Sequence, residues 1–397
     1  MPDAPTVLVI PSWYPPRGGE FFREHSLALA KAGLRVHVLA AIETGMRHDP
    51  GTYFSPLRST TTKLPNGAME HTQVYRRIPL LGKNNAMNWV NSIMNRYSDF
   101  ENNYGRPDLI QAHSSMWAGL AAARIKQLRG VPFVITEHRG RFTGRGTLAG
   151  ALIKSWHVPL LAEAFDQATR IICVSSALNK EIIALSPGSA QKLSVIPNMT
   201  DTAFFHPKEG AVKQHSGFRF LCVTHLEKAK GVDLLLKAMA SLDSNGSAET
   251  SLVVAGDGRQ RKELQQLCKQ LQINHKVVFK GTLTRNGVLH ELQQADALVL
   301  PSRFESFGIV LIEAMACGLP VVATDSGGPA DILTADTGIL CQPDSANALA
   351  DAMQQLIMRK HDFDPHNIRQ HCVARYSKEA ISSKYIGLYN HMLMGTA

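Results

Sequence analysis

The chain has 397 residues, of which 44% are hydrophobic and 19% charged, and its net charge is +9. This length exceeds what one hydrophobic core usually organises, so we expect two domains of about 100–200 residues each. The composition is typical of a globular protein, and no run of about 18 apolar residues predicts a transmembrane helix.

The charge is unevenly distributed along the chain. Residues 1–200 contain 22 Lys and Arg against 13 Asp and Glu, whereas residues 201–397 contain 20 of each. A basic half next to a neutral half predicts that the first half meets an anionic partner. A phosphorylated acceptor and an anionic membrane surface are both open. No nucleic-acid-binding module accompanies the charge, so we expect no nucleic acid.

Two features predict a cytoplasmic protein. The N-terminus, MPDAPTVLVIPSW, has neither the basic flank nor the long apolar run of a signal peptide. The six cysteines are scattered, with no C-x-x-C pair, as expected of free thiols in a reducing compartment.

The first half alternates short apolar runs with helical stretches. Strands are expected at 7–10, 35–40, 108–113, 132–138, 170–175 and 192–197, and a helix follows the first, third and fifth. The first helix, FREHSLALAKAG, ends at Gly33, a position that favours glycine. This alternation predicts a mostly parallel sheet with helices on both faces. Residues 43–105 are irregular, and their elements cannot be ordered from the sequence.

The alternation restarts after a linker-like stretch at 198–216. The expected strands are FRFLCVTH, SLVVAGDG, KVVFKG and DALVLPS, with helices from Asp233, from Arg261 and over 287–294. We therefore expect a first domain over 1–200, a linker over 201–216 and a second domain over 217–375. The final segment, 376–397, contains a helix that is expected to pack back on the first domain.

Glycines and histidines of the first half lie where doubly wound sheets bind ligands. Gly18 and Gly19 follow the first strand, where backbone N–H groups can approach a phosphate, although a plain turn is the commoner meaning of such a pair. Their spacing is not that of a dinucleotide fingerprint. His113 and His138 end two strands, where a neutral imidazole can donate to a sugar hydroxyl or steady a departing phosphate. A structural role is the alternative for both.

A basic stretch follows the second of these histidines. HRGRFTGRG (138–146) contains Arg139, Arg141 and Arg145 among glycines. A solvated loop explains such a run, and the alternative is a loop that binds the phosphate of an acceptor. The apolar segment after it, with Trp156, either touches lipid headgroups or is an ordinary core-facing helix.

Three loops of the second half have the composition of ligand loops. Lys230 precedes Gly231 at the start of a helix, so it is placed to meet a diphosphate, although a solvated lysine is an equal alternative. Gly256 ends the strand SLVVAG, and Leu283 lies in the loop GTLTRNG (281–287). The loop at Gly256 is a turn first and a ligand loop second, and the loop at 281–287 could hold a base edge through its backbone groups.

The most informative stretch is LVLPSRFESFGIVLIEAMACGLPVVAT (298–324), which predicts a strand, a loop, a helix opened by Gly308 and a second strand. Glu305 lies in the loop before the helix, and Glu313 lies more than one turn inside it. A purely structural crossover needs neither acid. The spacing alone fits a loop Glu and a surface Glu equally well.

Together these residues resemble the GT-B glycosyltransferases of family 4, a group of retaining enzymes. The resemblance runs from about residue 5 to 375 and is strongest in the paired-glutamate motif ESFGIVLIEAMACGLPVVAT. VVAGDG, the segment that ends in DALVLPS, and IPN (196–198) match as well. It implies an α/β architecture of two Rossmann-like, doubly wound domains that face each other across a cleft.

The resemblance also implies roles for individual residues. Glu305 would contact the hydroxyls of the donor sugar, Glu313 the ribose, and Lys230 the diphosphate, while His113 would position the transferred sugar. Backbone N–H groups at the helix N-terminus would point at sugar and phosphate. The catalytic set is His113, Lys230 and Glu305; the further donor-side residues are Gly18, Gly19, His225, Gly256, Leu283, Ser306, Phe307, Gly308, Ile309 and Glu313; the acceptor-side residues are His138, Arg139, Arg141 and Arg145.

One segment departs from the family pattern. THLEKAKG (224–231) has Thr224 and His225 where the family usually has Gly-Arg. A histidine supplies a weaker and pH-dependent charge, for which Lys228 would compensate.

The expected function is retaining transfer of a sugar from a UDP- or GDP-sugar to a glycan or lipid-linked acceptor, in bacterial polysaccharide or glycolipid synthesis at the cytoplasmic face of the membrane. No residue resembles a nucleophile beside an activating base, and no D-x-D motif or His/Cys cluster predicts a metal or other cofactor. A nucleotide-sugar epimerase or hydrolase on the same scaffold, and a non-catalytic nucleotide-sugar-binding subunit, remain open. A dehydrogenase is disfavoured because the glycine fingerprint is missing.

Overall fold

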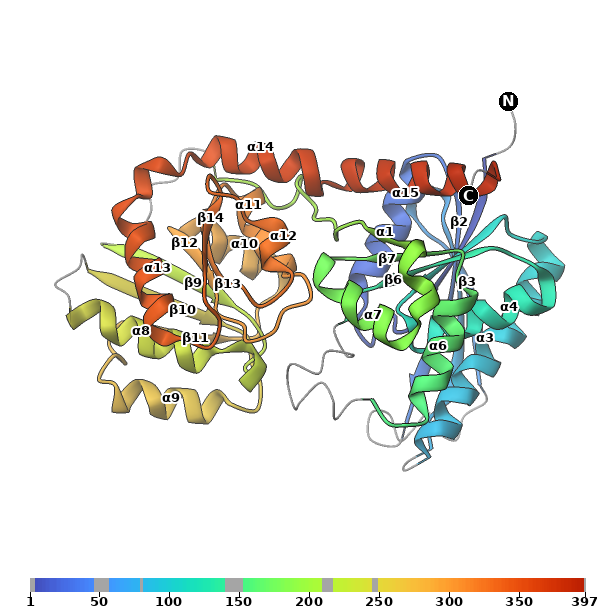
Figure 1. The fold of residues 1–397 in the computed structure, drawn as a ribbon, viewed down its shortest axis with the longest axis horizontal. Coiled ribbons are helices and arrows are strands. Elements are labelled where there is room, and N and C mark those ends of the chain that lie inside the picture. Colours follow the sequence, from blue (N-terminus) through green and yellow to red (C-terminus); the bar gives the residue numbers. More distant parts are fainter. Residues whose placement is uncertain are drawn as a thin grey trace.

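The computed structural model describes residues 4–45, 57–78, 81–139, 153–208, 217–244 and 249–395. The chain forms two α/β domains that lie side by side, with two helices of the C-terminal part running along one edge of both (Figure 1). The expected pair of mostly parallel, doubly wound sheets is confirmed.

The first domain contains an eight-stranded sheet of order β3-β4-β2-β1-β5-β6-β7-β8. All neighbours are parallel except β3 and β4. The strands are β1 (Thr6–Pro11), β2 (Arg35–Thr44), β3 (Ser59–Lys63), β4 (Met69–Arg76), β5 (Leu109–His113), β6 (Phe133–Glu137), β7 (Arg170–Cys173) and β8 (Leu193–Val195).

Helices cover both faces of this sheet, so β5 and β6 are buried along their whole length. The helices are α1 (Glu20–Lys31), α3 (Gly82–Tyr104), α4 (Leu120–Arg129), α6 (His157–Gln167) and α7 (Asn179–Leu185). Gly33 follows α1 with φ 101°, as its expected place after the helix end requires.

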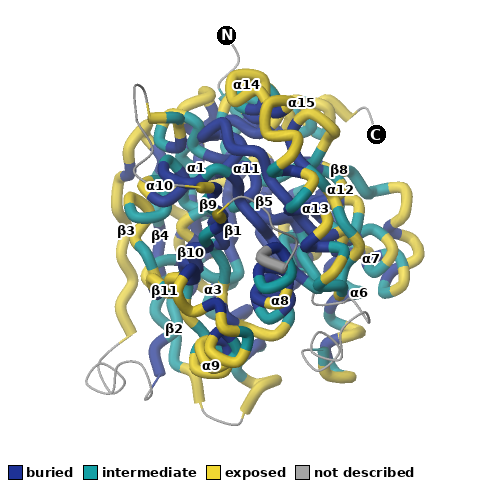
Figure 2. Tube along the Cα trace, turned by 90° about the vertical axis from the view of Figure 1, so that its left-hand side faces the viewer, coloured by how far each residue is buried: buried dark blue, intermediate teal, exposed yellow. Residues whose placement is uncertain are grey.

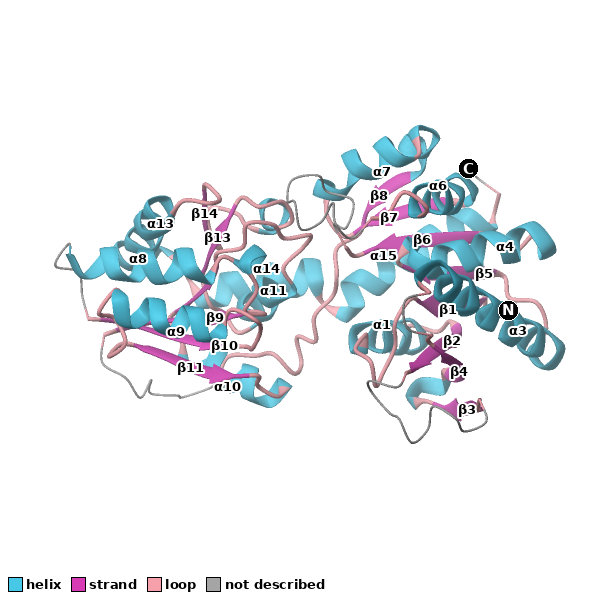
Figure 3. Cartoon of the chain, turned by 90° about the horizontal axis from the view of Figure 1, so that it is seen from below, coloured by secondary structure: helices cyan, strands magenta, loops and turns pink. Residues whose placement is uncertain are grey.

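The second domain contains a six-stranded parallel sheet of order β11-β10-β9-β12-β13-β14. Its strands β9, β10 and β11 lie side by side in Figure 3. Its strands are β9 (Phe218–Val223), β10 (Thr250–Ala255), β11 (Val277–Gly281), β12 (Ala297–Leu300), β13 (Val321–Thr324) and β14 (Gly338–Cys341). Its helices are α8 (Val232–Ser244), α9 (Arg261–Gln270), α10 (Arg285–Gln294), α11 (Ile309–Ala316), α12 (Pro329–Ile332), α13 (Ala346–Met358) and α14 (Pro365–Tyr376). After β9 the chain adds β10 and β11 on one side of that strand, and it then adds β12, β13 and β14 on the other side. Sheets of this kind bind ligands at such a switch point, here between β9 and β12.

The last helix, α15 (Lys378–Leu393), belongs by its packing to the first domain. It follows α14 after Ser377 and lies along α1 (Figure 1). The Tyr385 hydroxyl is 3.1 Å from Thr136 Oγ1, and the Tyr389 hydroxyl donates to Gln111 Oε1 at 2.7 Å, all of them buried. These buried hydrogen bonds join the C-terminal helix to the centre of the first sheet.

Residues 43–105, which the sequence left without an order, contain β3, β4 and the 23-residue helix α3. Helix α3 buries one face, which includes Trp89, Ile93, Tyr97 and Phe100, and its other positions are rich in Asn. Because this polar face lowers the hydrophobicity of the stretch, the helical period is not apparent from the sequence.

Burial follows the layers of the two domains, with buried strands inside and exposed outer helices such as α9 (Figure 2). All six cysteines are free thiols, and five of them are buried. No helix within the described ranges is both long and apolar enough to cross a membrane.

Candidate active site

The carboxyl ends of both sheets border a cavity of ≈ 610 Å³ between the domains. From the first domain the cavity is lined by Trp13, Phe21, His138, Arg139 and Asn198; from the second domain its polar lining includes Thr224, His225, Lys230, Asp257, Thr282, Glu305 and Ser306. The two domains therefore meet at the edge where each sheet is built to bind a ligand.

Lys230 and Glu305 form an ion pair in this cavity. Lys230 Nζ lies 2.7 Å from Glu305 Oε2, and Ser302 Oγ donates to the same oxygen at 3.3 Å. The Lys230 and Glu305 side chains are 26% and 13% exposed, so the pair faces the cavity but is largely shielded from water. Two residues from separate strand-end loops thus place one cation and one anion at the same point.

The N-terminus of α11 opens into the same cavity. Gly308 caps this helix with φ 97°, a conformation that favours glycine. Within the described ranges, the amide groups of residues 306–310 donate to no acceptor. Unpaired N–H groups and the positive end of the helix dipole together favour an anion.

Arg303 holds in place the segment THLEKAKG (224–231), which departs from the family pattern. Arg303 donates to the Lys228 carbonyl, and it forms a bidentate pair with Asp233 at 2.7 and 2.8 Å and a further contact with Asp344 at 2.7 Å. These carboxylates raise the pKa of Arg303. His225 and Lys230 line the cavity, but Lys228 does not, so its expected compensating role has no support in the geometry.

The two strand-end histidines lie at different depths. His138 lines the cavity, whereas His113 is 1% exposed and lies behind it, with its ring stacked on Phe22. His113 therefore lies behind His138 and not at the wall of the cavity, and its expected role in positioning the transferred sugar stays a prediction. Burial lowers the pKa of His138 to about 3 and also lowers that of His113.

The histidines form a hydrogen-bonded chain. His138 Nδ1 is 3.0 Å from Asn198 Oδ1, His138 Nε2 is 3.0 Å from His113 Nδ1, and His113 Nε2 is 3.1 Å from Nδ1 of buried His25. The amide oxygen of Asn198 accepts, so His138 is protonated on Nδ1 and accepts on Nε2, and the same tautomer follows along the chain. Both nitrogens of His138 are engaged, which leaves none for proton transfer in the cavity.

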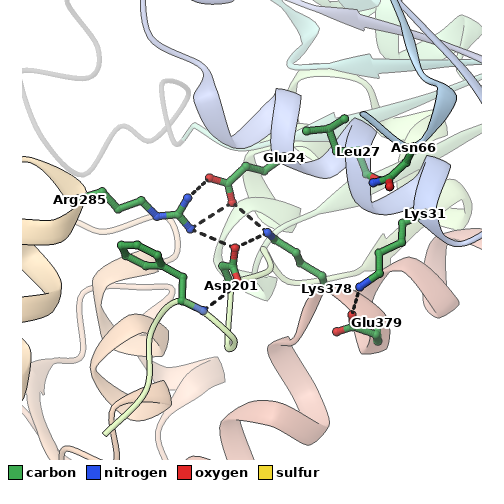
Figure 4. Close-up of polar contacts among 9 residues, drawn as sticks. Glu24, Leu27, Lys31, Asn66, Asp201, Arg285, Lys378 and Glu379 are labelled. Carbon is green, nitrogen blue, oxygen red and sulfur yellow. Dashed lines mark hydrogen bonds and ion pairs between the residues drawn. The ribbon is translucent and has the colours of Figure 1, made fainter. Parts of the chain in front are cut away.

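Glu313 lies inside α11 and does not line the cavity. Burial raises its pKa to about 7; the positive charge of Arg285 opposes this effect and the negative charge of Glu24 adds to it. Arg285 and Glu24 belong to a cluster that joins the two domains, together with Asp201 and Lys378 (Figure 4).

The predicted glycines have different roles. Gly18 and Gly19 do not line the cavity; a Cβ on Gly19 would lie 2.6 Å from the Trp13 carbonyl, so this glycine lets the strand-end loop close over the start of α1. Gly256 lines the cavity with φ 135°, and its Cβ would lie 1.8 Å from the Thr224 carbonyl. Leu283 and Ile309 also line the cavity.

Of the residues expected on the acceptor side, Arg139 lines the cavity, and its guanidinium lies 3.5 Å from the ring centre of Trp13. Arg141 and Arg145 lie outside the described residues. The sequence reasoning missed Trp13, Phe21 and Asn198. Two signals could have identified Trp13 and Asn198. Trp13 comes just after the first strand, and Asn198 ends the IPN segment.

Within the described ranges, no group of three or more His, Cys, Asp or Glu side chains is placed to hold a metal ion. The chemistry that the cavity itself offers is charge placement: cationic groups and helix amides opposite a carboxylate.

Two family models match the chain. Residues 19–204 match the model described as Glycosyltransferase Family 4, and residues 207–374 match that described as Glycosyl transferases group 1. The boundary between the two matches falls in the segment that joins the two sheets.

One relative is the D-inositol 3-phosphate glycosyltransferase of Pseudarthrobacter chlorophenolicus, 28% identical over 85% of this chain and 80% of its own length. Among solved structures, sucrose-phosphate synthase from Thermosynechococcus elongatus has a TM-score of 0.79 at 22% identity and covers 99% of this chain and 100% of its own. Anabaena HepE, solved in complex with UDP, has a TM-score of 0.73 at 19% identity and covers 97% and 99%. At these identities the structures show the fold alone, a GT-B fold.

Proposed function

The chain belongs to the group 1 glycosyltransferases of family 4, and on this basis we propose that it moves a sugar from a nucleoside diphosphate sugar to a glycan or lipid-linked acceptor, with retention of configuration. The proposed donor is a UDP- or GDP-sugar, and the HepE structure, solved with UDP in the same fold, supports the first of these. The proposed setting is bacterial surface polysaccharide or glycolipid synthesis at the cytoplasmic face of the membrane, which the basic first half of the chain supports.

The observation that supports this proposal most is the ion pair of Lys230 and Glu305 beside the N-terminus of α11. Within this pair each charge neutralises the other. A bound donor replaces the pair with two separate interactions: its diphosphate accepts from Lys230 and from the helix amides, and its sugar hydroxyls donate to Glu305.

The transfer breaks the bond between the sugar anomeric carbon and the diphosphate oxygen and forms a bond from the same carbon to the acceptor oxygen. The acceptor proton passes to the departing phosphate, so both events occur on one face of the sugar. This route needs no protein base, in agreement with a cavity-lining histidine whose two nitrogens are both engaged. Lys230 and the helix N-terminus stabilise the negative charge on the leaving group.

A thermal-shift panel of nucleoside diphosphate sugars tests the proposal. One base-and-sugar combination should raise the melting temperature of the wild type through preferential binding to the folded state. Lys230→Met should lose that shift. Arg259→Gln, which removes a 92% exposed cation from the same domain, is the matched control and should keep it.

Product analysis then separates transfer from its rivals. Release of free sugar or of an epimerised donor without acceptor would support a hydrolase or epimerase instead. Donor binding without turnover across a full range of acceptors would support a non-catalytic binding subunit.

A further inference from the structure

A second hollow lies at the carboxyl edge of the first sheet and adjoins the interdomain cavity. It has two lobes of ≈ 440 and ≈ 360 Å³, each within the range of about 300–1,000 Å³ usual for small-ligand sites. Trp13 and Arg139 line both the larger lobe and the interdomain cavity, so the spaces are contiguous. We call this space the aromatic hollow; the residues shared by its lobes are Ser12, Trp13, Glu43, Tyr75, Arg77 and Trp89.

The topology of the sheet explains why these side chains converge. Trp13 follows β1, Glu43 lies near the end of β2, Tyr75 near the end of β4, Trp117 after β5 and Arg139 after β6. The five strands are parallel neighbours, so their carboxyl ends meet at one edge. The hollow is thus a strand-end site of the first domain, separate from the Lys230 and Glu305 pair.

All four tryptophans of the chain gather here. Trp13, Trp89 and Trp117 line the hollow, and Trp156 stacks on Trp117 with ring centres 5.5 Å apart and planes 10° apart. The charge-placement mechanism uses none of these rings. Indole offers a flat apolar face against which the C–H face of a sugar ring packs, and an N–H group that can donate to a hydroxyl.

Most polar side chains of the hollow are already paired within the fold. Ser12 Oγ donates to the His113 carbonyl at 2.9 Å, and the Asn85 amide is bonded at both ends to the backbone of residue 78. Glu43 accepts from Tyr75 and from Arg77, each at 3.2 Å. These bonds fix the orientation of the groups, and Arg77 offsets the negative charge of Glu43.

Two cations remain. Arg17 is exposed at the smaller lobe and Arg139 lies at the boundary with the interdomain cavity, and neither guanidinium pairs with a carboxylate of the described residues. An unpaired guanidinium in a partly enclosed site favours a carboxylate or phosphate, which it can bind with two parallel hydrogen bonds.

We propose that the aromatic hollow binds the acceptor, and that the acceptor is a saccharide with an anionic group near the hydroxyl to be glycosylated. The sugar ring packs against the tryptophans, and its carboxylate or phosphate pairs with Arg139, with Arg17 as the second cation. The position of Arg139 between the two spaces places that anionic end next to the donor sugar. The assignment of this ligand as the acceptor rests on the proposed transferase function.

Intrinsic tryptophan fluorescence tests the proposal directly, because three of the four tryptophans line the hollow and the fourth stacks on one of them. The protein without donor is titrated with methyl glucuronide, glucose 1-phosphate and neutral methyl glucoside. We expect saturable quenching by at least one charged probe, with an affinity about tenfold or more above that of the neutral probe. The preferred charged probe tells a carboxylate from a phosphate.

Three variants complete the experiment. Arg139→Gln should reduce the affinity for the charged probe to that of the neutral one, whereas the control Arg259→Gln should not change it. Lys230→Met tests whether a charged probe binds through its phosphate in the donor cavity instead. If charged-probe binding is lost in Lys230→Met and kept in Arg139→Gln, the proposal is overturned. Equal affinities for charged and neutral probes also overturn it.

A thermal shift with nucleoside diphosphates on the same samples separates the two hypotheses. Nucleotide binding without a charged-sugar preference contradicts the aromatic hollow as an anion site and leaves the proposed function intact. A charged-sugar preference without nucleotide binding contradicts the proposed function and leaves the anionic saccharide site intact.

Discussion

The family resemblance assigns Glu313 to the ribose of the donor, and we predict that its protonation state affects donor binding. It is partly exposed on α11, and burial raises its pKa to about 7, so both of its protonation states are accessible near neutral pH. A ribose hydroxyl donates more strongly to a carboxylate than to a carboxylic acid. Donor binding through this residue would therefore favour the ionised form.

The sign of the pH effect follows from that preference. Free protein holds the Glu313 proton up to about pH 7, and donor-bound protein releases it, so donor affinity should rise by roughly tenfold between pH 6 and pH 8. Titration calorimetry at the two pH values measures this change. Glu313→Gln should bind more weakly and with the same affinity at both; an unchanged pH dependence in this variant would remove the ribose assignment.

At the same scale, the sequence placed Lys230, Glu305 and Gly308 at one cavity but did not predict the relative depth of His113 and His138. Glu305, Lys230 and Gly308 could be placed because they border strands and a helix with a strong pattern. The relative depth of His113 and His138 depends on the stacking of Phe22 and on the chain to His25, contacts between segments far apart in sequence. No periodicity encodes such contacts.

Helix α11 is the element on which the donor site depends. It is eight residues long and mostly buried, and it begins at a glycine in the left-handed region. A Cβ on Gly308 would lie 3.0 Å from Leu311 Cδ1 and 3.1 Å from Leu300 Cδ2. The orientation of the free amides therefore depends on the absence of a side chain at this position.

Gly308→Ala should lower both stability and donor affinity. The left-handed backbone alone should cost about 1–2 kcal/mol, and the tight contacts should shift the amides away from the diphosphate. Gly33→Ala is the matched control, because Gly33 has φ 101°, a Cβ there would have no atom within 4 Å, and the residue lies away from the cavity. Thermal unfolding and donor titration of both variants should show a shared stability loss, with weaker donor binding only for Gly308→Ala.

Among elements, the strongly apolar βα units were predictable and the others were not. Strands β9 to β13 of the second domain and helix α15 fall where the hydrophobic pattern predicted them, whereas β14 was not predicted. Helix α10 begins at Arg285, two residues before its expected start, because Thr284 caps it by accepting from the Gly287 amide. The antiparallel edge strand β3 is five exposed residues of Ser, Thr and Lys, so it has no buried face for a pattern to reveal.

For the whole molecule, one cluster of charges ties the domains together beside the cavity (Figure 4). Arg285 of the second domain lies 2.5 Å from Glu24 of α1 and 3.7 Å from Asp201 of the connecting segment, and Lys378 of α15 lies 2.5 Å from Asp201. The side chains are 21–43% exposed, so water and salt screen the cluster only in part.

Arg285→Gln should weaken this connection and shift the domains toward a more open arrangement. Small-angle scattering without donor should give a larger radius of gyration for the variant, and higher salt should move the wild type in the same direction. Arg359→Gln is the control, because that arginine pairs with Asp362 inside the second domain at 3.0 Å. Identical scattering for the wild type and Arg285→Gln would show that the cluster does not set the domain arrangement.

The central claim is that Lys230 and the α11 N-terminus bind the diphosphate of a nucleotide sugar while Glu305 binds its sugar. A crystal structure with the donor identified in the thermal-shift panel tests it most directly. We predict phosphate oxygens within hydrogen-bond distance of Lys230 Nζ and of the amides at residues 307–309, and a Glu305 carboxylate released from Lys230 to the sugar hydroxyls. A donor bound elsewhere, with the 2.7 Å contact between Lys230 and Glu305 intact, would contradict it.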